Sequence, residues 1–126
     1  MLRRLLLVLP LSLALSACGG DPMKSATAAL AKGDLPGAER ALDAVVAEHA
    51  DLASARCSRF VLYRHEALLG PASKQAAYLQ KSIEEYDWLA QHFKLTLDYK
   101  DMEGSLKSQP EPAALFNAAH KSIYGE

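Results

Sequence analysis

The stretch GDLPGAERALDAVV, residues 33–46, contains a turn signal followed by a helical pattern. A Gly-Asp pair marks a turn, and Pro36 stands where the first turn of a helix tolerates proline. Beyond it, apolar residues recur at alternating intervals of three and one, which is the spacing of one face of an α-helix. They are Ala38, Ala41, Leu42, Val45 and Val46. The stretch predicts a turn followed by an amphipathic helix over about residues 35–49.

The segments on both sides of this stretch also have a helical pattern. Ala, Leu, Lys, Glu and Gln are strong helix formers and dominate here, whereas no alternation or Asn-Gly or Asp-Gly turn predicts a hairpin of strands. The other expected helices cover residues 22–32, 52–69, 72–95, 99–106 (a short one) and 113–124. We take Asp51 as the N-cap of the third helix, Gly70-Pro71 as its end, and residues 109–112 as a break. The prediction is an all-α fold of antiparallel helix-turn-helix pairs.

The first 17 residues have the layout of a secretory signal peptide. Arg3 and Arg4 precede an apolar run from Leu5 to Leu15, and small residues follow it. This run is shorter than the roughly 20 residues that a transmembrane helix needs. Removing the segment deletes two of the 14 basic residues and none of the 15 acidic ones, so the mature chain is mildly acidic.

Leu15-Ser16-Ala17-Cys18 resembles the bacterial lipobox. The resemblance implies cleavage between Ala17 and Cys18, acylation of Cys18, and attachment to a bilayer through more than one acyl chain. Gly19 follows the cysteine, where the inner-membrane retention signal of such lipoproteins has Asp. We therefore expect an outer-membrane lipoprotein that faces the periplasm, with the inner membrane and the cell surface as alternatives.

Gly33-Asp34-Leu35-Pro36-Gly37-Ala38, followed by Leu42 and Val45, resembles the middle of a tetratricopeptide repeat. In that family a Gly-Asp turn joins two helices, and a small residue at the position of Ala38 lets them approach closely. Together with the lipobox, this resemblance implies a lipidated tether over residues 18–22 and a repeat-like domain over residues 23–126. Its expected parts are a first hairpin (23–52), a second hairpin (53–95), and an irregular segment with a capping helix (96–126). A plain bundle of four or five helices is the alternative.

Composition and motifs exclude several classes of function. A net charge of −1 over 126 residues does not fit a nucleic-acid-binding protein, and two cysteines make neither a disulfide scaffold nor a four-thiolate zinc site. His65-Glu66 begins like a zinc-protease motif, but Leu69 stands at the position of the second histidine. The four histidines are expected at surface or boundary positions, Cys57 is expected to be buried, and the Glu84-Glu85-Asp87 cluster is expected to form a solvated face. We predict no catalytic residue, cofactor or metal.

The candidate partner-binding residues lie on the helix over residues 52–69. They are Arg56, Arg59, Tyr63, Arg64 and His65. Arg and Tyr are enriched at binding hot spots. Continuing the repeat register places Cys57, Val61, Arg64 and His65 towards a groove. Arg64 lies within a mostly apolar face, so it is either a core residue paired with Glu84 or Glu85, or a ligand contact. Tyr86 and Trp88 are expected in the core.

Two classes of function remain. The first is a non-catalytic, membrane-anchored adaptor that binds an envelope protein, as in the assembly of an outer-membrane, pilus, secretion or export complex. The resemblance to tetratricopeptide lipoproteins implies this class, and a helix bound in a groove is its physical form. The second is a small stand-alone helical lipoprotein that acts as an inhibitor, immunity or exclusion factor. A groove lined by the arginines favours the first class, and a closed bundle favours the second.

Overall fold

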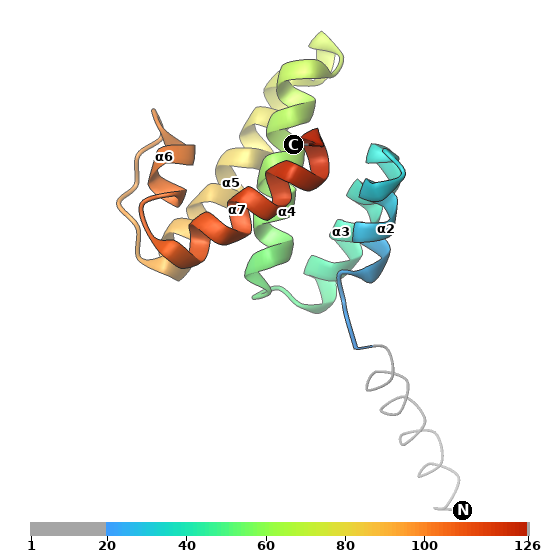
Figure 1. The fold of residues 1–126 in the computed structure, drawn as a ribbon. Coiled ribbons are helices and arrows are strands. Elements are labelled where there is room, and N and C mark those ends of the chain that lie inside the picture. Colours follow the sequence, from blue (N-terminus) through green and yellow to red (C-terminus); the bar gives the residue numbers. More distant parts are fainter. Residues whose placement is uncertain (1–19, 126) are drawn as a thin grey trace, which may run out of the picture.

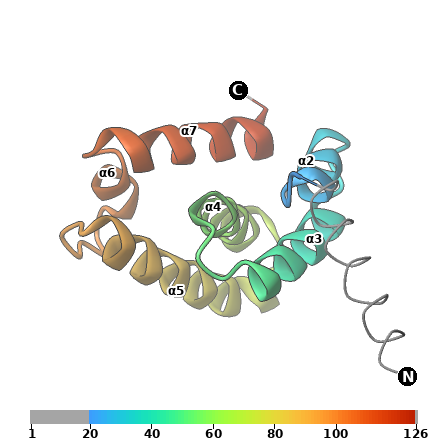
Figure 2. The ribbon, with the colours of Figure 1, turned by 90° about the horizontal axis from the view of Figure 1, so that it is seen from below.

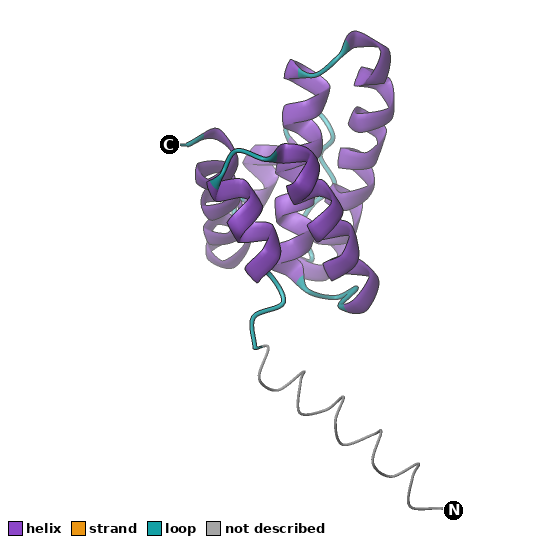
Figure 3. Cartoon of the chain, turned by 90° about the vertical axis from the view of Figure 1, so that its right-hand side faces the viewer, coloured by secondary structure: helices purple, strands orange, loops and turns teal. Residues whose placement is uncertain are grey.

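The computed structural model describes residues 20–125, and every regular element in this part of the chain is a helix (Figure 3). The elements are α2 (Lys24–Ala31), α3 (Leu35–Glu48), α4 (Ala53–Leu69), the 3-10 turn η1 (Ala72–Lys74), α5 (Gln75–Phe93), α6 (Met102–Leu106) and α7 (Pro110–Tyr124). The predicted all-α fold of helical hairpins is confirmed. Cys18 and the cleavage site at Ala17 lie outside the described residues. Among the helices of residues 20–125, none combines the length and the apolar character that crossing a membrane requires.

Helix α4 is the centre of the molecule, and the other helices surround it (Figure 2). The hairpins α2–α3 and α4–α5 pack side by side, and α7 returns across α4 on the side opposite α3 and α5. The C-terminal helix is therefore present as predicted, and it covers one face of α4. The described part of the chain begins at one end of the molecule, and the turn between α4 and α5 lies at the other end (Figure 1).

The turn of residues 33–37 has a physical explanation in the backbone. Gly33 has a φ of 73°, a conformation that is unstrained only for glycine. The Asp34 side chain accepts a hydrogen bond of 3.0 Å from the backbone N–H of Gly37, which caps the start of α3. A Cβ atom on Gly37 would collide with that carboxylate. Ala26 and Ala38 are fully buried where α2 and α3 meet, so the two helices approach closely there.

Two apolar clusters lie on different sides of α4. One cluster joins α4 to α2 and α3, with Leu42 and Leu62 fully buried. The other joins α4 to α5, α6 and α7, and contains Cys57, Phe60 and Tyr86. The prediction that Cys57 and Tyr86 are buried is confirmed, while Trp88 is only half-buried.

The start of the last helix and the N-cap of the third helix are predicted wrongly, and the short helix begins at Met102, not at residue 99. Residues 109–112 were expected to break the chain, but α7 begins at Pro110, and both prolines of this segment lie in its first turn. A proline is tolerated there because the first N–H groups of a helix have no intrahelical acceptor. The third helix is also capped differently. Leu52, not Asp51, is the N-cap residue, and no side chain bonds to the first N–H groups of α4.

Candidate binding surface

Glu85 lies at the centre of an ion-pair network that connects α4 and α5. Its carboxylate is 3.2 Å from Nη1 of Arg56 and 3.4 Å from Nε of Arg59. The residue is only 4% exposed. A buried carboxylate needs such partners, because its charge is costly to remove from water. Arg56 also donates a hydrogen bond of 2.9 Å from Nε to the Ala50 carbonyl and lies over the Trp88 ring.

The same network reaches α3 through Asp43. Nη2 of Arg59 lies 3.6 Å from Oδ1 of Asp43, and the Tyr63 hydroxyl donates to this oxygen over 3.4 Å. Arg59 Nε in turn donates to the Tyr63 hydroxyl over 2.8 Å. Burial alone would lower the pKa of the Arg59 guanidinium. The hydrogen bond to Tyr63 and the carboxylates of Glu85 and Asp43 have the larger combined effect, so the pKa is raised. Arg59 thus stays charged at the meeting point of three helices.

The two tyrosines of this region remain neutral hydrogen-bond donors. Burial raises the pKa of the Tyr63 phenol, although the bond from Arg59 acts in the opposite direction. Partial burial and the bond to Glu39 raise the pKa of Tyr78 to about 12. The Tyr78 hydroxyl donates to Glu39 over 2.9 Å and so bridges α5 to α3, with Lys81 4.0 Å from the same carboxylate.

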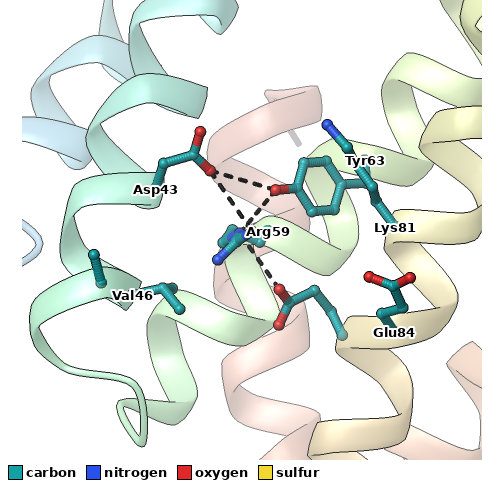
Figure 4. Close-up of a pocket in the computed structure, with 8 residues that line it drawn as sticks. Asp43, Val46, Arg59, Tyr63, Lys81 and Glu84 are labelled. Atoms are coloured by element: carbon teal, nitrogen blue, oxygen red, sulfur yellow. Dashed lines mark hydrogen bonds and ion pairs between the residues drawn. The ribbon is translucent and has the colours of Figure 1, made fainter.

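These side chains form an open groove between α3 and α5, which we call the α3–α5 groove (Figure 4). Its volume is about 440 Å³. It is lined by Asp43, Val46, Ala47, Arg59, Tyr63, Lys81, Glu84 and Glu85. Arg59 and Tyr63 form its floor, while Asp43, Lys81 and Glu84 are exposed at its rim. The groove offers both signs of charge to a partner, with fixed geometry only at its floor.

The five predicted binding residues do not share one surface. Arg56, Arg59 and Tyr63 face α3 and α5, and Tyr63 is almost fully buried. Arg64 and His65 lie on the other side of α4, where Arg64 meets α6 and His65 meets α7. No groove lined by all three arginines is present in the described part of the chain. The concave face expected for Cys57, Val61, Arg64 and His65 is covered by α7.

Two expectations about charged partners are corrected. Arg64 pairs with Glu103 of α6 at 3.5 Å, not with Glu84 or Glu85. The cluster of Glu84, Glu85 and Asp87 is not a uniformly solvated face, because Glu85 points into the bundle while Glu84 is exposed. Glu85 belongs to the buried stripe of Ser82, Tyr86 and Leu89 on α5. Its place on that stripe is the sequence signal that could have identified it.

Cys57 and the four histidines are not among the residues that line the α3–α5 groove. Burial raises the pKa of the Cys57 thiol to about 12, so the nucleophilic thiolate is scarce at neutral pH. His49 and His92 are exposed, and His65 and His120 are half-buried. Between residues 20 and 125, no group of three His, Cys, Asp or Glu side chains is arranged to hold a metal ion. The charged groups described above instead pair with one another.

Comparisons with known proteins identify no relative of this chain. No family model matches this chain, and no curated protein or solved structure matches it significantly.

Proposed function

We propose that this protein is a non-catalytic interaction module of the bacterial cell envelope, anchored by lipid at Cys18 and built from tetratricopeptide-like hairpins. A partner protein docks in the α3–α5 groove. The observation that carries this proposal is the exposed rim of Asp43, Lys81 and Glu84 above a floor that is held rigid by Arg59 and Glu85. A rigid floor lowers the entropic cost of ordering the site on binding.

The charges of the rim specify the partner's chemistry. Asp43 and Glu84 place two carboxylates on opposite walls, and Lys81 lies on the same helix as Glu84, with its ammonium over the Tyr63 ring. A partner with a basic side chain between the walls and an acidic one near Lys81 complements this pattern. Complementary charge favours the correct partner and raises the rate of association. The proposed ligand is therefore a segment of an envelope protein that carries both signs of charge.

Charge reversal at the rim tests the groove. We expect the Glu84→Lys variant of the native lipoprotein to recover its partner about tenfold less well in a crosslinking pull-down from membranes, because the new lysine opposes the basic side chain of the partner. Glu48→Lys is the matched control, since Glu48 and Glu84 are both exposed and the net charge changes equally. Equal loss of partner in both variants, or no loss in either, contradicts docking in the groove.

The lipid anchor has its own test. We expect Cys18→Ser to abolish incorporation of labelled palmitate and to block lipoprotein processing, so that residues 1–17 stay attached, because the acyl chains that give stable attachment are carried by the Cys18 thiol. Asp21→Ala is the control, since it changes the tether and leaves the lipobox intact. Palmitate incorporation and processing that persist in Cys18→Ser would refute the anchor.

A second candidate is a stand-alone inhibitor, immunity or exclusion factor. The closure of the far face of α4 by α7 favours it, because a body closed on that face suits a single target. The same pull-down separates the candidates. An adaptor recovers at least two proteins in one complex, whereas a blocking factor recovers a single protein whose activity falls when it is bound.

A further inference from the structure

The α4–α5 hairpin extends beyond the other helices at its turn (Figure 1). Leu68 and Leu69 at the end of α4 are 65% and 67% exposed there, and Leu79 on α5 is 43% exposed. Every residue from 71 to 77 is exposed as well. Single exposed leucines are ordinary, whereas apolar side chains gathered at one exposed place indicate an interaction site. We call this end of the hairpin, residues 68–79, the leucine tip.

The leucine tip carries a shallow hollow and not a groove. The hollow has a volume of about 100 Å³ and is lined by Arg64, Ala67, Leu68, Gln75 and Leu79. A hollow of this size accepts one apolar group, whereas a partner helix needs a groove along which several side chains dock. Arg64 pairs with Glu103 of α6, so the hollow opens on the side of α4 that faces away from the α3–α5 groove.

The charge of the leucine tip is complementary to an anionic lipid surface. Lys74 and Lys81 are the only charged residues between positions 67 and 83, although acidic residues outnumber basic ones 15 to 14 in the chain. Lys74 is exposed in the turn itself. Leucines beside a lysine suit the interface of a bilayer, because the apolar groups enter the acyl region while the ammonium stays among the headgroups. Anionic headgroups attract such a lysine.

The proposed anchor keeps the leucine tip within reach of the same bilayer. Cys18 stands six residues before Lys24, where α2 begins, so the chain between them spans at most about 20 Å. Helix α4, with 17 residues, is about 25 Å long. The described part of the chain begins at the end of the molecule opposite the tip (Figure 1). A domain held this close to the membrane touches it with both ends when α4 and α5 lie along the bilayer.

We propose that the leucine tip is a second membrane contact, which rests on the lipid surface to which Cys18 anchors the protein. The leucines enter the acyl region, and Lys74 lies among anionic headgroups. A single anchored residue leaves the domain free to turn, whereas two contacts fix its orientation. The α3–α5 groove stays accessible, because the hollow of the tip opens on the other side of α4. This inference rests on the proposed lipid anchor and not on docking in the groove.

Photocrosslinking to lipid tests the contact in the native lipoprotein, reconstituted into vesicles of phosphatidylethanolamine and phosphatidylglycerol. A photoreactive residue replaces Ala72, which is exposed in the turn, and the transfer of labelled phospholipid to the protein is measured. We expect transfer, and we expect Leu69→Gln to lower its yield about threefold, because apolar area at the tip is lost. Leu97→Gln is the matched control and is expected to leave the yield unchanged, since Leu97 is 53% exposed but lies between α5 and α6.

A charge variant tests the contact with the headgroups. Lys74→Glu is expected to lower the yield about threefold in these vesicles and less in vesicles of phosphatidylcholine, which carry no net charge. The proposal is overturned by the absence of lipid transfer to position 72, by equal yields for Leu69→Gln and Leu97→Gln, or by a crosslink from position 72 to an envelope protein and none to lipid. The mass of the purified lipoprotein shows whether Cys18 is acylated, so a failure of the anchor is distinguished from a failure of the tip.

Discussion

Replacing Glu85 by alanine is expected to lower the free energy of unfolding by about 3 kcal/mol. The substitution leaves Arg56 and Arg59 without the carboxylate that both face, and their side chains are only 18% and 19% exposed. Removing one partner of a buried pair costs about 3–5 kcal/mol, because an uncompensated charge remains. The lower end applies here, since Arg56 keeps the Ala50 carbonyl and Arg59 keeps Asp43.

Urea denaturation of the mature domain measures this effect. The neighbouring Glu84 is exposed, so Glu84→Ala is the matched control and is expected to change the free energy of unfolding by about 0.5 kcal/mol or less. Equal denaturation midpoints for the two variants would show that Glu85 is not the link between α4 and α5.

Replacing Phe60 by alanine is expected to lower the free energy of unfolding by about 4 kcal/mol. Phe60 is fully buried in the middle of α4, and its ring lies 6.2 Å from that of Tyr86 on α5 and 6.5 Å from that of Phe116 on α7. The substitution removes a large apolar group and leaves a cavity that three helices border. Both the lost transfer free energy and the cavity contribute to the cost.

The control for Phe60→Ala is Leu69→Ala on the same helix. Leu69 is 67% exposed, so its truncation removes little packing and is expected to change stability by about 0.5 kcal/mol or less. Thermal and urea denaturation compare the two variants. A small domain has only about 5–15 kcal/mol of stability in total, so a loss of about 4 kcal/mol is readily measured. A Phe60→Ala protein as stable as Leu69→Ala would contradict the assignment of α4 as the central helix.

Local pattern was sufficient to predict most helices but not all of their ends. The intervals of three and one in residues 35–48 reflect one buried face, and the Gly-Asp turn reflects a backbone conformation that glycine supplies. The predicted start of α7 is wrong because proline inside a helix breaks it, whereas proline in the first turn does not. Pro110 and Pro112 lie in the first turn of α7. That distinction depends on where the chain enters the bundle, which local sequence does not specify.

The side-chain partners were less predictable than the helices. Arg56 and Arg59 are predicted from the sequence as partner-binding residues, but both pair with Glu85, 29 residues after Arg56. For Arg64 the sequence leaves a pair with Glu84 or Glu85 and a ligand contact as alternatives, yet α6 folds back towards α4 and brings Glu103 to it. Helical periodicity identifies the buried face of a helix and does not identify the helix that covers it. The pairings therefore required the tertiary structure.

Site-specific photocrosslinking in the cell envelope tests whether a partner protein docks in the α3–α5 groove. A photoreactive residue replaces Glu84 at the rim of the groove in one variant and the exposed Ala28 on α2 in a second. Both positions are exposed on helices, so neither substitution is expected to disturb the fold. We predict a discrete crosslinked partner from position 84 and none from position 28. Crosslinks of equal yield from both positions, or none from position 84 while position 28 reacts, would contradict the claim.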